Sequence, residues 1–280
     1  MSAADFERLQ PPGNGAGMLF AQISDPHVVA PPGKGELYGV DTADALIRAL
    51  TAIAQIRPHI ETVVMTGDLV NKGRPDEYAG LAGVLSAFPF RYLLVPGNHD
   101  HRDTLRQAFP AFAELQGAGF IQYTAELGPV RLVVIDTLIE GRHDACLDET
   151  RLGWLDAELG RAPAMPTVIA MHHPPFKTGL ASFDAMPFEG ASAFEALIRR
   201  HPHVERIICG HNHRAVQRRF GGTIVSVCPS TAFAYALHLE PGQGFKTSAE
   251  PPGFQVHLWT DGQLVTHTHA LPPTLTQPAH

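Results

Sequence analysis

Five short segments of the chain place metal-binding side chains directly after apolar runs that are typical of buried strands. They are Asp25-Pro26-His27, Gly67-Asp68, Gly97-Asn98-His99-Asp100, His172-His173 and Gly210-His211-Asn212-His213. Side chains this far apart in sequence meet only in a fold that gathers the ends of several strands along one rim. Asp, Asn and His together are the ligand set of a site for two divalent metals, so the chain is expected to be a metal-dependent hydrolase.

Strand-like and helix-like patterns alternate between these segments. Six short apolar runs rich in branched residues predict strands, at 19–23, 62–65, 92–95, 132–135, 168–171 and 206–209. Helices are predicted over 45–56, from Pro75 to before Pro89, and from a capping box of Ser192 and Glu195 to near Pro202. This alternation indicates an α/β fold.

The last part of the chain changes to an antiparallel pattern. A strand is predicted over 223–227, and the runs 254–259 and 264–269 flank Asp261-Gly262, a dipeptide that favours a tight hairpin turn. We therefore expect a mixed sheet or two packed sheets. In open α/β layers ligands collect beyond the carboxyl ends of the strands, which is where all five segments fall.

The length of 280 residues suits one α/β domain with a sizeable core. We expect this domain over 18–270, between an N-terminal tail (1–17) with Pro11-Pro12 and three glycines and a proline- and threonine-rich C-terminal tail (271–280). No segment approaches the roughly 20 apolar residues of a membrane span, and the N-terminus lacks a signal-peptide pattern. Export and membrane insertion are not expected.

Charge and cysteine usage narrow the partners and the location. A net charge of −7 and a pI of about 6.1 give no general attraction to nucleic acid, so a nucleic-acid polymer is not an expected partner. The cysteines Cys146, Cys209 and Cys228 show no paired spacing, and the last two lie in apolar runs. This pattern favours the reducing cytoplasm.

Each segment has a simpler explanation when it is taken alone. Asp before Pro favours a turn, and Asp after Gly often only caps a helix or turn. His211 and His213 can face one cavity if the backbone is extended, whereas adjacent residues in extended backbone point opposite ways. Only one of His172 and His173 is therefore expected to be a ligand. A metal site explains the five segments better because all of them follow strands.

Together the segments resemble the signature of the calcineurin-like metallophosphoesterases, D-x-H, G-D, G-N-H-D or G-N-H-E, a later H, and G-H-x-H. The resemblance runs from about Leu19 to about Val227. Further motifs are similar to the class III cyclic nucleotide phosphodiesterases and the bacterial glycerophosphodiesterases: Leu37-Tyr38-Gly39, Gly73 to Tyr78, Leu152-Gly153-Trp154-Leu155, and the histidine pair before Pro174-Pro175. The resemblance implies a four-layer sandwich of two mixed β-sheets flanked by helices, and assembly into a homodimer or higher homo-oligomer.

The resemblance also implies a role for each metal-binding residue. The first metal would be held by Asp25, His27 and His213, the second by Asn98, His172 and His211, and Asp68 would bridge both. A carboxylate has two oxygens and can span two cations, whereas a neutral imidazole serves one metal. Mixed oxygen and nitrogen ligands suit manganese, iron, cobalt or zinc better than calcium.

The expected reaction is hydrolysis of a small phosphodiester, such as 3′,5′-cyclic AMP or a glycerophosphodiester, by a water activated between the two metals. His99 has no metal assigned and is expected to be catalytic with Asp68, either by hydrogen bonding to the phosphoryl group or by protonating the leaving alkoxide. Asp100 is expected to orient His99 or His27, and His173 to be a supporting or structural residue.

Two other functions stay open from the sequence. A pyrophosphatase of nucleotide- or lipid-linked substrates would need an apolar groove, which the stretch Phe183, Met186, Pro187 and Phe188 could line, although core packing or a subunit contact suits these residues equally well. A non-catalytic metal-binding scaffold would be expected to have lost ligands, and none of the seven is lost.

The loops 29–40, 176–191 and 229–253 are expected to select the substrate. His257, His267 and His269 are expected to be solvated, and His143 lacks a ligand spacing.

Overall fold

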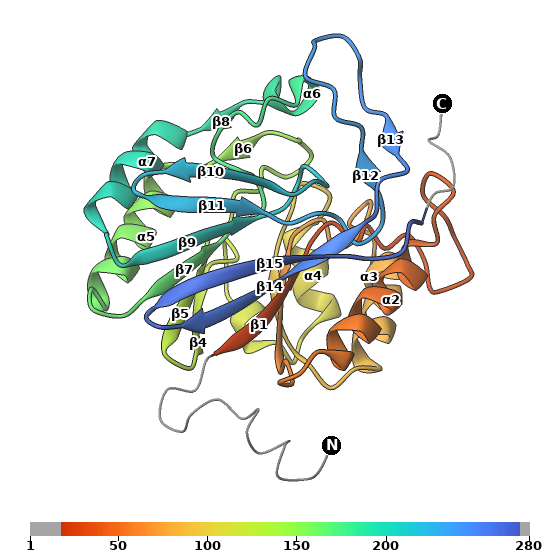
Figure 1. Ribbon diagram of the computed structural model, residues 1–280, viewed down its shortest axis with the longest axis horizontal. Helices are drawn as coiled ribbons and strands as arrows, with labels where there is room; N and C mark the ends of the chain where they lie inside the picture. Colours follow the sequence, from red (N-terminus) through yellow and green to blue (C-terminus); the bar gives the residue numbers. More distant parts are fainter. Residues whose placement is uncertain (1–17, 275–280) are drawn as a thin grey trace.

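Two packed β-sheets form the centre of the computed structural model, which describes residues 18–274 (Figure 1). The first sheet has the strand order β15-β14-β1-β2-β3 and the second has the order β10-β11-β9-β7-β5-β4. Parallel and antiparallel pairs occur in both sheets. Helices cover the outer faces, so the predicted four-layer sandwich with two mixed sheets is confirmed.

The strand predictions are confirmed, with ends that shift by two residues at most. The first sheet contains β1 (Leu19–Ile23), β2 (Thr62–Thr66), β3 (Arg91–Val95), β14 (Gly253–Thr260) and β15 (Gln263–Ala270). The second contains β4 (Tyr123–Leu127), β5 (Val130–Val134), β7 (Thr167–Ala170), β9 (Val204–Cys209), β10 (Val216–Phe220) and β11 (Thr223–Val227). Two small ribbons pair β6 (Ala145–Cys146) with β8 (Phe188–Glu189), and β12 (Ala234–Tyr235) with β13 (Thr247–Ser248).

Side-chain caps are present at the start of only some of the helices. The helices are α2 (Thr42–Gln55), α3 (Pro75–Ser86), α4 (Arg102–Ala108), α5 (Glu149–Arg161), α6 (Ala181–Asp184) and α7 (Ala191–Arg200), with a 3₁₀ turn η1 (Ala113–Leu115). The first of them starts three residues before the predicted position because Asp41 accepts a hydrogen bond from the Asp44 amide. The predicted capping box of Ser192 and Glu195 is wrong. Gly190 precedes α7 in the left-handed region, with φ 84°, and Ser192 lies inside the helix.

Alternate residues of the second sheet face two separate cores. Leu132 and Val134 of β5 pack between the sheets, whereas Val133 packs with the helices on the outer face. In β9 Ile208 faces inward and Ile207 faces outward in the same way. Because β5 and β9 are covered on both faces, their sequences are largely apolar. Polar segments follow at the carboxyl ends of such strands.

Polar side chains also connect the two sheets. Gln22 of β1 donates a hydrogen bond of 2.9 Å to the carbonyl oxygen of Cys209 at the end of β9. His257 of β14 is fully buried, 3.0 Å from Gln22 Oε1 and 2.9 Å from Thr266 Oγ1. The expectation that His257 is solvated is therefore wrong, because β14 is an inner strand of its sheet; His267 and His269, on the edge strand β15, are exposed.

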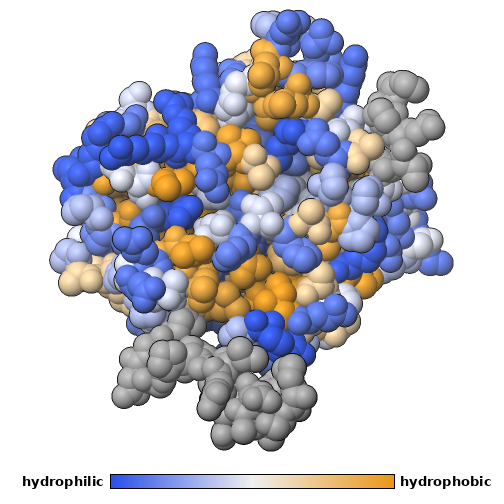
Figure 2. All heavy atoms as spheres, viewed as in Figure 1, coloured by the Kyte–Doolittle hydropathy of each residue, from blue (hydrophilic) through white to orange (hydrophobic). Residues whose placement is uncertain are grey.

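An arm between β12 and β13 projects beside the second sheet (Figure 1). Its side chains Leu237, Leu239 and Phe245 are at least half exposed, and Figure 2 shows apolar side chains at this end of the molecule.

At the C-terminal side, the Leu271 amide donates a hydrogen bond to the Pro252 carbonyl, and the Thr274 hydroxyl donates one to the Ala232 carbonyl. The chain is thus attached as far as residue 274. The predicted tail 1–17 and residues 275–280 lie outside the described residues. Between residues 18 and 274, no helix has the length and apolarity to cross a bilayer.

Candidate metal centre

The ends of five strands bring the predicted ligands together. Strands β1, β2 and β3 of the first sheet run parallel, as do β7 and β9 of the second, so their carboxyl ends lie at the same side of the molecule. All seven predicted metal ligands are buried there: Asp25, His27, Asp68, Asn98, His172, His211 and His213. Buried polar groups in this number require partners, and a pair of cations would supply them.

One group of ligand atoms is formed by Asp25, His27 and His213, whose donor atoms lie within 4.8 Å of one another. His27 Nε2 is 3.0 Å from His213 Nε2, which in turn is 3.6 Å from Asp25 Oδ1. His213 Nδ1 lies 3.0 Å from the Phe233 carbonyl oxygen, to which it can only donate. The electron pair of His213 Nε2 is therefore directed at the space that a cation would fill.

A second group contains His172, His211 and Asn98. His172 and His211 share a group of donor atoms within 4.8 Å. His172 Nδ1 donates to the Thr66 carbonyl over 2.7 Å, which leaves Nε2 free, 3.1 Å from Asn98 Oδ1. The two histidines and the amide oxygen are thus arranged around a position that one cation could occupy.

Asp68 lies between the two groups. Its Oδ2 is 3.5 Å from His27 Nε2 in the first group, and its Oδ1 is 3.4 Å from His172 Nε2 in the second. The backbone amide of His99 also donates to Oδ1 over 2.9 Å and fixes the carboxylate. Each oxygen of Asp68 therefore faces a different set of ligands, which is the arrangement that a bridging carboxylate needs.

Left-handed backbone is concentrated in this centre. Among the described residues, seven that are not glycine have positive φ, and five of these are predicted ligands: Asp25, His27, Asp68, His211 and His213. Such residues are uncommon in folded proteins and raise the energy of the backbone, so their clustering marks a functional site. The expectation that His211 and His213 share a cavity through extended backbone is wrong. Both lie in bends with φ of 74° and 54°.

The glycines that precede three of the ligands leave no room for a side chain. A β-carbon at Gly67 would clash with the His172 ring, one at Gly97 with Asp68, and one at Gly210 with Ser24 and Asp25. The structure shows that each glycine lets the backbone approach another ligand closely.

The protonation of the centre favours cation binding. Burial lowers the pKa of His27 and His211 well below the ordinary value and that of His213 to about 3, so these rings stay neutral and keep a free electron pair. Burial opposes the ionisation of Asp68, but His172 and His99 outweigh it and hold its pKa well below the usual range. Burial also opposes the charging of His172, yet Asp68 raises that pKa to about 9. A cation beside His172 would replace this proton.

His99 lies at the edge of the centre. Its Nδ1 donates to the Asn71 carbonyl over 2.7 Å, and its ring contacts that of His27 edge-on, with 4.7 Å between the centroids. One of its ring nitrogens lies within 4.8 Å of the donor atoms of His27 and Asp68. With Nδ1 occupied, Nε2 is the atom left to act on a bound molecule.

Asp100 does not orient a histidine, so that prediction is wrong. Its carboxylate accepts hydrogen bonds from the amides of Gly97, Leu69 and Val70 and from the Tyr78 hydroxyl. Burial raises its pKa to about 7. Asp100 therefore holds the loop after β2 against the loop after β3, and both loops carry ligands.

His173 lies closer to the centre than the sequence predicts. The chain bends at residues 172–173, so the two rings do not point opposite ways and their centroids are 4.7 Å apart. His173 shares a group of donor atoms with His172 and His211. Its Nδ1 is 2.8 Å from Thr137 Oγ1, whereas its Nε2 is buried without a hydrogen bond of normal geometry.

His143 is the residue at this site that sequence reasoning missed. Its Nδ1 accepts a hydrogen bond of 2.8 Å from Asn98 Nδ2, which turns the amide oxygen of Asn98 toward His172. His143 follows no motif, and only the fold brings the loop after β5 to this rim. A polar residue shortly after a predicted strand end was the one available signal.

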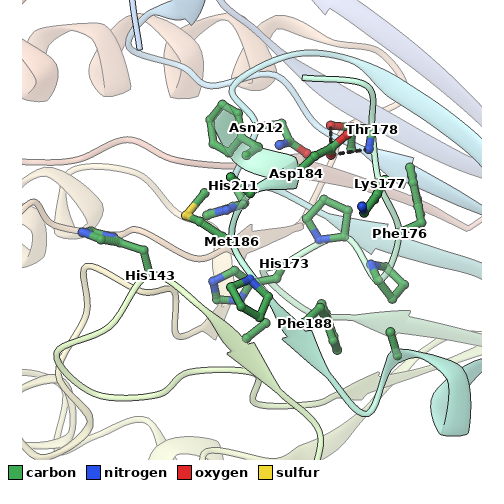
Figure 3. A pocket seen from close by; sticks show the side chains of 17 residues that line it. His143, His173, Phe176, Lys177, Thr178, Asp184, Met186, Phe188, His211 and Asn212 are labelled. Atoms are coloured by element: carbon green, nitrogen blue, oxygen red, sulfur yellow. Dashed lines mark hydrogen bonds between the residues drawn. The ribbon is translucent and has the colours of Figure 1, made fainter. Parts of the chain in front are cut away.

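Two cavities open from the centre and share a wall. A pocket of about 250 Å³ is lined by His27, Asp68, Asn98, His99 and His213 together with aromatic side chains. Beside it lies a chamber of about 410 Å³, shown in Figure 3, whose wall includes all four residues of the predicted groove, Phe183, Met186, Pro187 and Phe188. His143, Phe183, Met186 and His211 border both cavities.

Comparison with known proteins agrees with this geometry. Residues 18–215 match the calcineurin-like phosphoesterase family. The glycerophosphodiester phosphodiesterase GpdQ of Enterobacter lignolyticus is 31% identical over 257 residues, 91% of this chain and 91% of that protein. The 3′,5′-cyclic adenosine monophosphate phosphodiesterase CpdA of Escherichia coli is 27% identical over 273 residues, 94% of this chain and 93% of that protein.

Solved structures share the fold. A dimetal phosphatase from Danio rerio superposes with a TM-score of 0.67 at 19% identity, covering 90% of this chain and 96% of that one. The purple acid phosphatase PPD1 from yellow lupin superposes with a TM-score of 0.65 at 14% identity, covering 93% of this chain and 52% of that one.

Proposed function

The chain belongs to the calcineurin-like phosphoesterase family, and we propose that it is a phosphodiesterase that uses two divalent metal ions to hydrolyse small phosphodiesters. Support comes from relatives named as phosphodiesterases of glycerophosphodiesters and of 3′,5′-cyclic AMP, each matched over nine-tenths of the chain. The phosphodiester class is therefore favoured over a pyrophosphate.

The position of Asp68 is the observation that carries this proposal. Its two carboxylate oxygens face His27 on one side and His172 on the other, at 3.5 and 3.4 Å. Asp25, His27 and His213 would hold one cation, and Asn98, His172 and His211 the other. Two cations held in this way would supply an activated water and would neutralise charge on the phosphoryl oxygens.

His99 would act directly on the substrate. Its Nδ1 is engaged by the Asn71 carbonyl, so Nε2 faces the pocket that Asp68 and His27 line. From there a neutral ring accepts a hydrogen bond, and a protonated ring donates one to a phosphoryl oxygen or passes its proton to the leaving alkoxide. His99 thus completes a site in which four other histidines, His27, His172, His211 and His213, are proposed metal ligands.

The donor set limits which metals fit the site, and the cysteines indicate the cellular location. Four histidines, two aspartates and an asparagine around the cation pair suit manganese, iron, cobalt or zinc. The cysteines Cys146, Cys209 and Cys228 are buried and unpaired, which supports a cytoplasmic location, where thiols stay reduced. Assembly into a homodimer stays a prediction from the family.

The test is to load the purified protein with manganese and compare an aryl phosphodiester with the matching monoester, and then 3′,5′-cyclic AMP with glycerophosphodiesters. We expect faster turnover of the diester, and loss of turnover on exhaustive chelation. Preference for the monoester would contradict the diesterase assignment, and activity that survives chelation would contradict the mechanism.

Asp68→Asn tests the bridging role of Asp68, because the asparagine side chain keeps the shape of the carboxylate and removes its charge. We expect this variant to lose turnover and to bind less than the full complement of metal. Asp261→Asn is the control, because Asp261 is exposed in the turn between β14 and β15 with φ 51°, a conformation that Asn accepts readily. If the two variants were equally active, Asp68 would not be the bridging metal ligand that the proposed mechanism requires.

A further inference from the structure

Left-handed backbone occurs at two residues that are neither glycine nor predicted ligands, Tyr38 and Asp261. The other five such residues in the described part of the chain are all predicted ligands. Asn and Asp enter the left-handed region readily, whereas a bulky side chain does so only where the surrounding structure holds it there. Tyr38 is therefore the strained residue that the metal centre leaves unexplained.

Tyr38 and Asp261 occupy the same kind of turn. The dipeptide Tyr38-Gly39 has φ angles of 53° and 77°, and Asp261-Gly262 has φ angles of 51° and 76°. In both places the residues before and after the dipeptide pair in antiparallel fashion. Positive φ at both central residues is the pattern of a type I′ turn, which prefers Asn-Gly or Asp-Gly. One turn of the chain thus has the preferred sequence, and the other has a tyrosine in its place.

The two turns differ in what they face. Asp261 is exposed and follows the end of β14 that pairs with the first residues of β1, so it lies at the end of that sheet away from the ligands. Tyr38 lines the pocket of about 250 Å³ together with Asp68 and His99. The tyrosine is therefore found in the turn from which a large side chain reaches the metal centre.

The ring of Tyr38 lies beside the first group of ligands. It packs edge-on against Phe233, with 5.2 Å between the centroids, and Phe233 in turn contacts the rings of His27 and His213 at 6.1 and 4.7 Å. Tyr235 also packs on His213, at 4.7 Å, and Tyr38 adds to burial in raising the pKa of Tyr235, so the two phenols lie close together. These contacts hold the Tyr38 ring at one wall of the pocket.

Packing within the chain does not account for a tyrosine at this position. The side chain of Tyr38 is 49% exposed although its ring contacts Phe233. An asparagine would suit the backbone better, and an aromatic ring that stays half exposed adds little to the stability of the fold. The open face of the ring is therefore available to a molecule bound in the pocket, because aromatic side chains bind flat and apolar groups through such contacts.

A phosphodiester would meet this ring with one particular part. During in-line attack the leaving oxygen lies opposite the attacking water, and the second ester group projects to the side. His99 is assigned to the phosphoryl oxygens and the leaving group, so the wall that Tyr38 forms is open to the second group. A monoester has no second group. Contact with Tyr38 would thus favour a diester over a monoester with the same leaving group.

We propose that the ring of Tyr38 contacts the ester group that stays on phosphorus, and that this contact makes the site selective for diesters over monoesters. The proposal rests on the phosphodiesterase function above and names a residue that sets its selectivity. It gives the loop 29–40 a selecting role, which was expected from the sequence. It also explains why this type I′ turn has a tyrosine where the turn at Asp261 has its preferred residue.

The test compares two substrates that share a leaving group, bis(4-nitrophenyl) phosphate and 4-nitrophenyl phosphate. Tyr38→Asn gives the turn a preferred residue and removes the ring, whereas Tyr38→Phe keeps the ring and removes the hydroxyl. We expect the ratio of kcat/KM for the diester to kcat/KM for the monoester to fall about tenfold or more in Tyr38→Asn. In Tyr38→Phe this ratio should stay within about twofold of the wild type, and both variants should bind the full complement of manganese.

Thermal unfolding tests the strain without turnover. The melting temperature of Tyr38→Asn should equal or exceed that of the wild type, because asparagine accepts the left-handed backbone. Asp261→Tyr makes the reverse exchange in the matching turn and serves as the control. This variant should have a lower melting temperature than the wild type and an unchanged ratio of diester to monoester activity.

Three results would overturn the proposal. The first is an unchanged ratio in Tyr38→Asn, and the second is equal losses for both substrates with a lower melting temperature, which would make Tyr38 a structural residue. The third is the same fall in ratio in Tyr38→Phe as in Tyr38→Asn, which would assign the effect to the hydroxyl. Failure of the proposed function has a different signature, because the manganese-loaded wild type would then prefer the monoester or hydrolyse neither substrate.

Discussion

Gly97 lies directly against Asp68. A β-carbon at residue 97 would come closer than 3.0 Å to the backbone nitrogen and to Oδ1 of Asp68, and Oδ1 is the oxygen that faces His172. Gly97 does not have a positive φ, so the requirement for glycine here is space and not backbone conformation. The loop after β3 can therefore supply Asn98 only if the residue before it has no side chain.

Gly97→Ala is expected to displace the bridging carboxylate and to lower both metal content and turnover, the latter by about a hundredfold or more. Metal analysis of the purified variant and steady-state kinetics measure the two effects. Gly153→Ala is the control, because Gly153 lies in α5 with open space at its β-carbon; this variant should keep full activity and gain about 0.5–1 kcal/mol of stability. Full metal content and activity in Gly97→Ala would show that Asp68 does not need its present position.

His99→Ala is expected to lower kcat by about a hundredfold or more while metal content stays that of the wild type, because His99 is assigned to the substrate and not to a cation. Kinetics and metal analysis on the same sample separate the two roles. His101→Ala should change neither, since His101 is exposed two residues further on. Joint loss of metal and activity in His99→Ala would make His99 a ligand or a structural residue.

His143→Ala is expected to weaken one of the two metal sites by about ten- to a hundredfold, because the Asn98 amide loses the partner that orients its oxygen. Titration of the metal-free protein with manganese should show one altered affinity and one unchanged affinity. Turnover should recover at high manganese concentration. His267→Ala on the exposed strand β15 gives the control. Unchanged affinity at both sites would show that the hydrogen bond to Asn98 has no influence on metal binding.

His257 should make the stability of the protein depend on pH. Burial lowers its pKa from 6.5 to about 3 in the folded protein. Below pH 6.5 the unfolded chain therefore takes up a proton that the folded chain does not, so this contribution to stability is present above pH 6.5 and is lost as pH falls toward 3.

Between pH 7 and pH 5 the loss from His257 should be about 2 kcal/mol. Chemical denaturation at the two pH values measures it. His257→Gln cannot take up the proton, and the free energy of unfolding of this variant should fall less over the same interval than that of the wild type. An identical fall in both proteins would mean that His257 is protonated, or remains neutral, to the same extent in the folded and unfolded states.

The strands and most of the candidate site could be predicted because the signals are local. Leu19 to Ile23 is apolar since β1 is covered on both faces, and Asp25 and His27 follow it because ligands collect where such strands end. Asp261-Gly262 specified the hairpin turn by the same kind of local preference. These features depend on neighbours in sequence, so the sequence carries them.

What could not be predicted depends on partners far away in sequence. His143 reaches Asn98 across 45 residues, and no spacing rule connects them. His257 looked like its neighbours on the hairpin until the pairing of β14 with β1 placed it inside the sheet. Asp100 was expected to hold a histidine because a histidine adjoins it, but the backbone amides of two loops take its carboxylate.

The pairing of β1 with β14 also limits the order in which the protein can be completed. Residues Leu19–Gln22 are synthesised long before residues 255–258, which form one of their two neighbouring strands. A chain cut short before residue 253 would still contain all seven proposed metal ligands but would leave one edge of β1 open to other chains. Nascent and truncated forms should therefore need protection from aggregation until β14 has been synthesised.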